Sequence, residues 1–245
     1  MTVDTASFTL EITQDAPAVF HAPSCSGSLD LRLADCMDVM RGFEDGHFDL
    51  AVVDPPYGIG AGGSFGRYWD STLGKSAPAA VRNIVKDWDK AIPGADYWRE
   101  LFRVSKHQIV WGGNYFTEHL PPRRGWIGWD KKQPEAASFG MLEMAWSSFD
   151  RPTKMFRMYS THVTQGERIH PTQKPIDLYK WIFSKYAAPG QRVLDTHMGS
   201  GSVAIAAHYF GVHLTACEID PDYYEAAKVR IDRETRQQNF DLNYK

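Results

Sequence analysis

The sequence lacks the features that mark secreted, membrane-spanning and metal-binding proteins. Its three cysteines, Cys25, Cys36 and Cys217, stand too far apart for CxxC pairs or a disulfide framework. No apolar run is long enough to cross a bilayer, and the acidic N-terminus has no basic region of a secretion signal. The nine histidines do not cluster at ligand spacing, so no metal is expected. We therefore predict a reduced, cytoplasmic protein with no membrane partner.

The net charge is small, but charged residues are unevenly distributed. A net charge of −3 argues against a generic binder of polyanions. Residues 1–60 nevertheless hold two basic residues against ten acidic ones, whereas residues 121–185 hold eleven lysines and arginines against six acidic residues. Because phosphate contacts need only local charge, the second region permits a nucleic-acid face. Ordinary solvated surface is the alternative, and charge alone leaves both open.

The order of apolar segments predicts one α/β domain over residues 1–245. Hydrophobic residues make up 43% of the chain, which is enough for a full core. Expected strands lie at 29–33, 49–53, 108–111, 126–129, 142–149, 191–194 and 213–217. Expected helices lie at 37–42, within 78–103, and at 176–187, 202–210 and 221–236. Strands alternating with helices are typical of a doubly wound, mostly parallel Rossmann-like sheet.

A glycine turn follows one of these strands. Asp195 ends the strand, Gly199-Ser200-Gly201 lead into a helix, and the next strand ends at Glu218. Glycines at such a turn let the backbone approach a ligand, and an acidic group at that spacing can accept hydrogen bonds from ribose hydroxyls. The spacing is not GxGxxG, which favours a nucleoside over a dinucleotide. A helix-capping turn with a surface glutamate is the alternative.

The second informative unit is the tetrad Asp54-Pro55-Pro56-Tyr57. It follows a buried strand, and two prolines fix the backbone so that a carboxylate and a phenol ring are held in rigid relation. Ligands of open α/β sheets bind at such strand ends. A plain strand-ending turn, with Tyr57 as a core ring, is the alternative.

With these motifs in order, the sequence resembles the amino-methyltransferases of DNA, in particular their permuted β group with the DPPY tetrad. In that group the tetrad precedes the cofactor loop, as it does here. Residues 34–36 match the family's short acidic element, and residues 170–175 match the element that leads into the cofactor loop. Thr196-His197 depart from the family's common Pro-Phe after the aspartate, which puts the packing of residue 197 in doubt, and we assign His197 no catalytic role.

The resemblance implies methyl transfer from S-adenosylmethionine to N6 of a flipped adenine in duplex DNA. Asp54 and the Pro55 carbonyl would accept the two amino hydrogens, and Tyr57 would stack on the base. The implied catalytic residues are Asp54, Pro55, Pro56 and Tyr57. The implied cofactor-binding residues are Ala34, Asp35, Cys36, Asp54, Thr172, Lys174, Asp195, Gly199, Ser200, Gly201, Ser202 and Glu218. Among these, Asp35 should meet the cofactor adenine, Glu218 its ribose, and Thr172 and Lys174 its amino-acid end.

Contact with double-stranded DNA is expected from two segments. One is a mobile DNA or target loop at 58–77, with Arg67 and Lys75. The other is a target-recognition region at 121–168, inserted in the domain. Its basic residues are Arg123, Arg124, Lys131, Lys132, Arg151, Lys154 and Arg157. By the same resemblance, a homodimer and a separate restriction endonuclease are candidate partners.

Several alternatives stay open at this point. The target could be N4 of cytosine, and the acceptor could be RNA or a protein amide. A non-catalytic module that binds DNA or cofactor is a third class. Asp35 could be a turn cap, and Lys174 could be a solvated lysine at a helix start. A cytosine-C5 reaction has no support, because none of the cysteines follows a proline.

Overall fold

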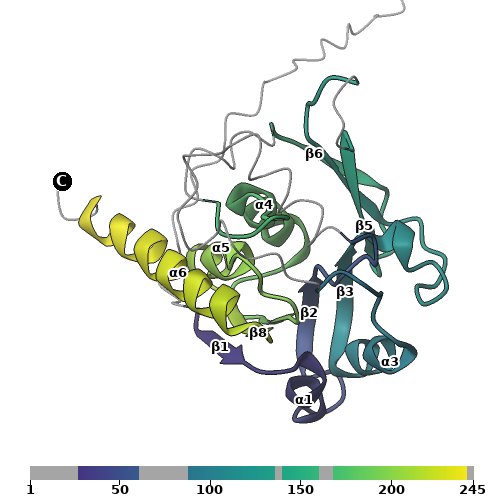
Figure 1. Ribbon diagram of the computed structural model, residues 1–245, viewed down its shortest axis with the longest axis horizontal. Helices are drawn as coiled ribbons and strands as arrows, with labels where there is room; N and C mark the ends of the chain where they lie inside the picture. Colours follow the sequence, from purple (N-terminus) through teal and green to yellow (C-terminus); the bar gives the residue numbers. More distant parts are fainter. Residues whose placement is uncertain (1–26, 61–87, 136–139, 160–167, 242–245) are drawn as a thin grey trace, which may run out of the picture.

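The computed structural model describes residues 27–60, 88–135, 140–159 and 168–241, through which a mixed sheet of eight strands runs (Figure 1). The strands are β1 (Leu29–Leu33), β2 (Phe48–Val53), β3 (Ser105–Trp111), β4 (Trp126–Asp130), β5 (Leu142–Ser147), β6 (Lys154–Arg157), β7 (Arg192–Asp195) and β8 (His213–Glu218). The helices are α1 (Cys36–Arg41), α3 (Ala95–Val104), α4 (Ile176–Tyr186), α5 (Ser202–Phe210), α6 (Pro221–Asp241) and the short 3-10 helix η1 (Gly113–Tyr115).

The strand order is β1-β8-β7-β2-β3-β5-β4-β6. The five strands from β1 to β3 in this order are parallel, whereas β5 is antiparallel to both β3 and β4. Because β5 reverses the direction once, β4 and its parallel neighbour β6 run the same way as β2. The expected doubly wound, mostly parallel sheet is confirmed. We call the edge at which β2, β7 and β8 end the carboxyl-end edge, where open α/β sheets bind ligands.

Alternate residues of β2 serve two cores. Leu50 and Val52 pack in a buried cluster with side chains of α4, α5 and α6. Ala51 and Val53 pack in a second cluster with side chains of α1 and α3. Successive strand residues point to opposite faces, so a run that is apolar throughout has to be covered on both sides. Figure 1 shows α4 to α6 on one side of β2 and α1 and α3 on the other.

The structure extends the predicted elements at several points. β3 begins at Ser105, three residues earlier than expected, and β6 was not predicted. In the predicted helical segment 78–103, the described helix begins only at Ala95, after Pro93 and Gly94. The lead-in at 1–26 and most of the predicted DNA loop, including Arg67 and Lys75, lie outside the described residues. Among the helices described, none has the length and apolar character needed to cross a membrane.

Candidate active site

The tetrad lies at the carboxyl-end edge, directly after β2. The Tyr57 hydroxyl donates to Asp54 Oδ1 at 2.6 Å. The backbone N–H groups of Tyr57 and Gly58 donate to the buried Asp89 at 2.6 and 2.8 Å. Asp89 therefore anchors the loop that carries the tetrad. Its position 32 residues further along the chain is set by a long-range contact that no local sequence pattern indicates.

The Tyr57 ring is held by neighbours on η1. It stacks on Tyr115, with ring centroids 5.0 Å apart and an interplanar angle of 15°, and meets the edge of Phe116. Gly112, just before η1, has φ +69°, and a Cβ built on it would lie 2.2 Å from a Tyr57 ring carbon. A glycine is needed there both for the backbone conformation and for the close approach.

A cavity of about 400 Å³ opens at the carboxyl-end edge and joins the two loops that the sequence analysis singled out. Both loops contribute to its wall, since Asp54 comes from the end of β2 and Gly199 from the glycine turn. The predicted site residues that line it are Asp54, Pro56, Thr172, Lys174, Asp195, Gly199, Ser200, Ser202 and Glu218. A volume of this size falls in the range of small-molecule sites, about 300–1,000 Å³.

Glu218 shapes the glycine turn. Its Oε2 accepts the Gly199 N–H at 2.9 Å, and its Oε1 accepts the Asp220 N–H at 3.0 Å. Gly201 does not line the cavity; a Cβ there would lie 2.8 Å from Ile231 on α6. The missing side chain of Gly201 thus makes room for α6, and its expected place beside a cofactor stays a prediction.

A buried arginine that the sequence analysis missed ties α6 to this turn. Arg230 donates from Nη1 to the Ser200 carbonyl at 2.7 Å and to Ser202 Oγ at 2.9 Å. Burial lowers the pKa of its guanidinium to about 10. Arg230 directly precedes the buried Ile231 on α6, but the sequence does not indicate that its side chain bonds to Ser200 and Ser202.

Asp195 offers a buried carboxylate to the cavity. Burial raises its pKa to about 8, against the opposing effect of the His197 backbone N–H, which it accepts at 3.1 Å. Asp54 and Glu218 raise it further by charge repulsion. A cation placed in the cavity would relieve this repulsion and favour the ionised form.

The short acidic element, residues 34–36, follows β1, the strand that pairs with β8 at the side of the cavity. The Ala34 N–H bonds to the Glu218 carbonyl, and Cys36 begins α1. Asp35 is the N-cap of α1, where its Oδ1 accepts the Met37 N–H at 2.7 Å. The structure therefore gives Asp35 the capping role, and these three residues are not among those that line the cavity.

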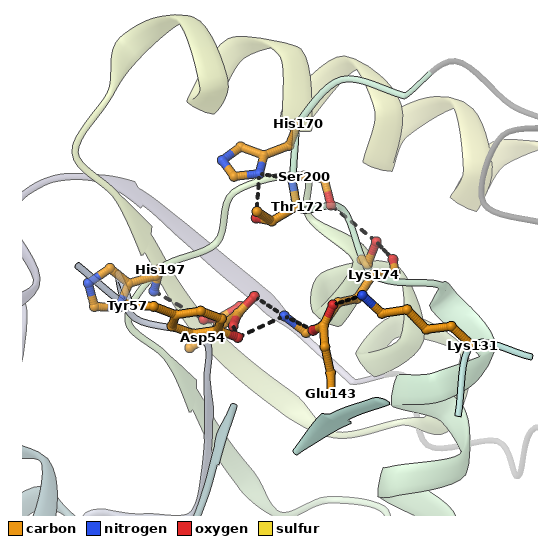
Figure 2. Close-up of polar contacts among 11 residues, drawn as sticks. Asp54, Tyr57, Lys131, Glu143, His170, Thr172, Lys174, His197 and Ser200 are labelled. Carbon is orange, nitrogen blue, oxygen red and sulfur yellow. Dashed lines mark hydrogen bonds and ion pairs between the residues drawn. The ribbon is translucent and has the colours of Figure 1, made fainter. Parts of the chain in front are cut away.

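Lys174 differs most from the expectation. Its side chain is only 3% exposed, which excludes the solvated helix-start alternative. Its ammonium lies 2.5 Å from Asp54 Oδ2 and 3.2 Å from Glu143 Oε2 (Figure 2). It therefore contacts the tetrad carboxylate, whereas the sequence analysis expected it at the amino-acid end of a cofactor.

The structure places the basic residues of the predicted target-recognition region at two opposite edges of the sheet. Arg123 and Arg124 precede β4 and Arg151 precedes β6, so these residues and Lys154 lie at the edge opposite Asp54. Lys131 lies at the carboxyl-end edge but is only 15% exposed, because it pairs with Glu143. Lys132 and Arg157 remain at the edge that carries the tetrad.

Two histidines at the cavity make stability depend on pH. Burial lowers the pKa of His170 to about 3 and that of His197 to about 4. The unfolded chain binds these protons near pH 6.5, so the fold loses stability as pH falls from about 6.5 towards 4. Asp195 acts in the opposite sense, because its raised pKa makes the folded form the stronger proton binder between about 4 and 8.

A comparison with the His170→Phe variant isolates the contribution of His170 to this pH dependence. From pH 7 to pH 5, wild type should lose on the order of 1 kcal/mol more unfolding free energy than His170→Phe, as measured by urea denaturation. His119→Phe, a ring substitution outside the cavity lining, serves as control. An equal pH dependence of wild type and His170→Phe would contradict the buried neutral state of His170.

The fold and the cavity at the carboxyl-end edge define the class: this is a Rossmann-like α/β fold, similar to that of several solved structures. Residues 126–229 match the family model described as DNA methylase. The matched segment contains Lys174, the glycine turn and Glu218, and the tetrad lies before it. This match, together with two curated relatives, supports a relationship to the general family of N6- and N4-amino methyltransferases.

Individual relatives are distant in sequence. YubD of Escherichia coli (strain K12), named as a methylase, is 25% identical over 211 residues, which cover 80% of this chain and 87% of YubD. TTHA0409 of Thermus thermophilus, in a complex with S-adenosyl-L-methionine, has a TM-score of 0.51 at 18% identity, over 84% of this chain and 95% of that one. The cytosine-N4-specific PvuII DNA methyltransferase has a TM-score of 0.55 at 12% identity, over 90% and 94%.

Proposed function

We propose that the protein is an S-adenosylmethionine-dependent DNA methyltransferase that methylates N6 of adenine. One observation carries the proposal: the carboxylate of the DPPY tetrad and the glycine turn line the same cavity. Such a cavity lets a methyl donor on the turn face an amino group held by Asp54. The family match supports DNA as the acceptor.

The residues that line the cavity fit the cofactor. Glu218 presents a carboxylate for ribose hydroxyls, and the neighbouring Ile219 is 66% exposed and offers an apolar surface for the adenine ring. Burial raises the pKa of Asp195, and Asp54 and Glu218 raise it further, so the cofactor's ammonium group would relieve an unfavourable environment there. Thr172, Ser200 and Ser202 add hydroxyls on the same wall. When bound, S-adenosylmethionine supplies an electrophilic methyl group on a sulfonium.

The chain's own part in the reaction is positioning and charge stabilisation. Asp54 accepts one N–H of the target amine, and the Pro55 carbonyl accepts the other. Both acceptors draw the nitrogen lone pair out of conjugation and towards the methyl donor. As the new C–N bond forms, the S–C bond to the transferred methyl group would break, and its electron pair would stay on sulfur as a neutral thioether. The nitrogen becomes cationic and acidic, and it releases one proton to Asp54 or to water.

Tyr57 contributes through its hydroxyl as well as its ring. The hydroxyl fixes Asp54 Oδ1, while the ring, backed by Gly112 and Tyr115, offers a rigid aromatic wall beside a flipped base. The Tyr57→Phe variant should therefore keep the wall and lose the orientation of Asp54.

We expect Tyr57→Phe to lower the methyl-transfer rate constant by about tenfold, the effect of one hydrogen bond to a charged group. Cofactor affinity should stay within about twofold, because Tyr57 does not line the cavity. Single-turnover kinetics and calorimetric binding measure the two quantities. Tyr115→Phe removes a hydroxyl from the stacked ring and is the control; an equal loss in both variants would contradict the role of the Tyr57 hydroxyl.

Adenine is favoured because an aspartate in the first tetrad position is commoner in adenine-N6 than in cytosine-N4 enzymes of the family that the chain resembles. The fold likeness to a cytosine-N4 enzyme keeps N4 of cytosine as the alternative. Both reactions place an exocyclic amine against the same two acceptors.

The test is to incubate the protein with methyl-labelled cofactor and duplex DNA, RNA or protein, and to identify the labelled product by mass spectrometry after digestion. The proposal predicts N6-methyladenine from DNA. N4-methylcytosine would overturn the choice of base, and label in RNA or protein alone would overturn the choice of acceptor. Absence of transfer to any acceptor, with cofactor bound, would leave the non-catalytic module.

A further inference from the structure

Four charged side chains of alternating sign form a chain of contacts that begins at the tetrad (Figure 2). Asp54 follows β2, Lys174 precedes α4, Glu143 lies on β5 and Lys131 follows β4. The Lys174 ammonium joins the two carboxylates, and Lys131 pairs with the second oxygen of Glu143. The sequence separates these residues widely, and the pairing of β5 with β3 and β4 brings them together.

The number of N–H donors on Lys174 decides whether it can also bind a cofactor carboxylate. An ammonium group has three N–H donors and no acceptor. Within the described part of the chain its polar neighbours are three: Asp54 Oδ2 at 2.5 Å, Glu143 Oε2 at 3.2 Å and the Tyr57 hydroxyl at 3.3 Å. The Trp111 ring lies beside the same ammonium, 5.2 Å from it. This arrangement uses every donor and leaves none for a cofactor carboxylate.

The charges of the network balance. Burial would lower the pKa of Lys174, but Asp54 and Glu143 raise it above the usual value, so the ammonium stays charged. Burial would raise the pKa of Glu143, but Lys174 and Lys131 lower it, so the carboxylate stays charged. Each buried charge thus has an opposite partner, which is the condition for keeping charges inside a protein.

We propose that Lys174 is a positioning residue for the Asp54 carboxylate and not a ligand of the cofactor, with Glu143 balancing its charge. The inference rests on the proposed function. With Lys174 on Oδ2 and Tyr57 on Oδ1, the carboxylate is fixed from two sides and keeps lone pairs that the target amine would use. The Lys174 carbonyl accepts from Ser202 Oγ at 2.8 Å, which also fixes the backbone against the start of α5.

The pH dependence of the network involves all charged and titratable groups that surround Lys174. Those on the loops and strands around it are Asp54, Tyr57, Lys131, Glu143, Arg168, His170, Tyr179 and Asp195. The Lys174 ammonium attracts the Asp54 carboxylate, and the Glu143 carboxylate repels it. Loss of the Lys174 charge and loss of the Glu143 charge should therefore move the acid limb of the pH–rate profile in opposite directions.

The experiment compares Lys174→Met, Glu143→Gln and the control Lys180→Met, a lysine on α4 that pairs with Asp177. Single-turnover methyl transfer is measured across pH, and cofactor binding is measured by calorimetry. For Lys174→Met we expect a rate constant lowered about a hundredfold, an acid limb displaced to higher pH, and an unchanged cofactor Kd. For Glu143→Gln we expect the acid limb at lower pH, and for Lys180→Met no change.

A cofactor Kd raised about tenfold or more in Lys174→Met, with the rate constant retained, would overturn the inference and return Lys174 to the cofactor. Acid limbs that move together in the two network variants would also overturn it. Inactive wild-type protein would instead count against the proposed function.

If the wild-type protein is inactive, measurements of unfolding still test whether Lys174 pairs with Asp54. In urea, Lys174→Met should unfold earlier than the double variant Lys174→Met/Asp54→Asn, because the second change removes a carboxylate that has lost its partner. Additive effects of the two changes would show that Lys174 does not hold Asp54.

Discussion

The Asp54→Ala variant is expected to transfer methyl groups about a thousandfold more slowly than wild type, within the range lost with a catalytic acceptor or donor. Asp54 lies where the cavity meets the tetrad, and it would accept the N–H that aligns the target nitrogen. The change removes this acceptor and also leaves the Lys174 ammonium beside one carboxylate instead of two. The measurement is the single-turnover rate with labelled cofactor and duplex DNA.

Two further variants make that result specific. Asp54→Asn keeps the shape and one acceptor oxygen but removes the charge, and we expect an intermediate loss of about a hundredfold. Asp96→Ala changes a carboxylate on α3 whose side chain is 72% exposed, and should leave the rate unchanged. Methyl transfer by Asp54→Ala at a rate near that of wild type would refute the catalytic assignment.

The Gly112→Ala variant is expected to lose about 3 kcal/mol of unfolding free energy and about a hundredfold in methyl-transfer rate. Its φ of +69° is strained for alanine, and its new Cβ would lie 2.2 Å from the Tyr57 ring. The ring has to move, and the 2.6 Å bond between the Tyr57 hydroxyl and Asp54 breaks with it.

The chain offers a matched control for this change. Gly190 has φ +80° with nothing within 4 Å of a built Cβ, so Gly190→Ala has the backbone strain without the collision. We expect it to lose about 1–2 kcal/mol of unfolding free energy with an unchanged rate. Urea denaturation and single-turnover kinetics provide both quantities; equal effects of the two variants would show that the contact between Gly112 and Tyr57 has no role in activity.

The parallel half of the sheet could be predicted because its information is local. β2 is apolar apart from Asp49 and is followed by Asp54, and β7 ends at Asp195 before the glycine turn. Strand ends of a parallel sheet meet at one edge, so the cavity between the two loops follows from connectivity. The short β6 shows no such pattern, since its four residues are mostly exposed and its pairing with β4 is remote in sequence.

The polar network of the site could not be predicted, because its contacts join residues that are far apart in the sequence. Lys174 bonds to a carboxylate 120 residues away, and Asp89 anchors a loop 32 residues before it. The match of residues 170–175 to a family element placed Lys174 near the site but did not indicate its contact with Asp54. The basic residues at 123–157 failed as a single face because β4 and β6 carry charges at both ends of the sheet, and sequence proximity does not distinguish the two edges.

The central claim is that one cavity holds a methyl donor on the glycine turn against the carboxylate of Asp54. A crystal structure of the protein with S-adenosylmethionine tests it directly. The account predicts ribose hydroxyls on Glu218, the ammonium group near Asp195 and the donor methyl directed to the side where Asp54 and Pro55 stand. A cofactor bound elsewhere on the sheet, or one whose methyl points away from Asp54, would contradict it.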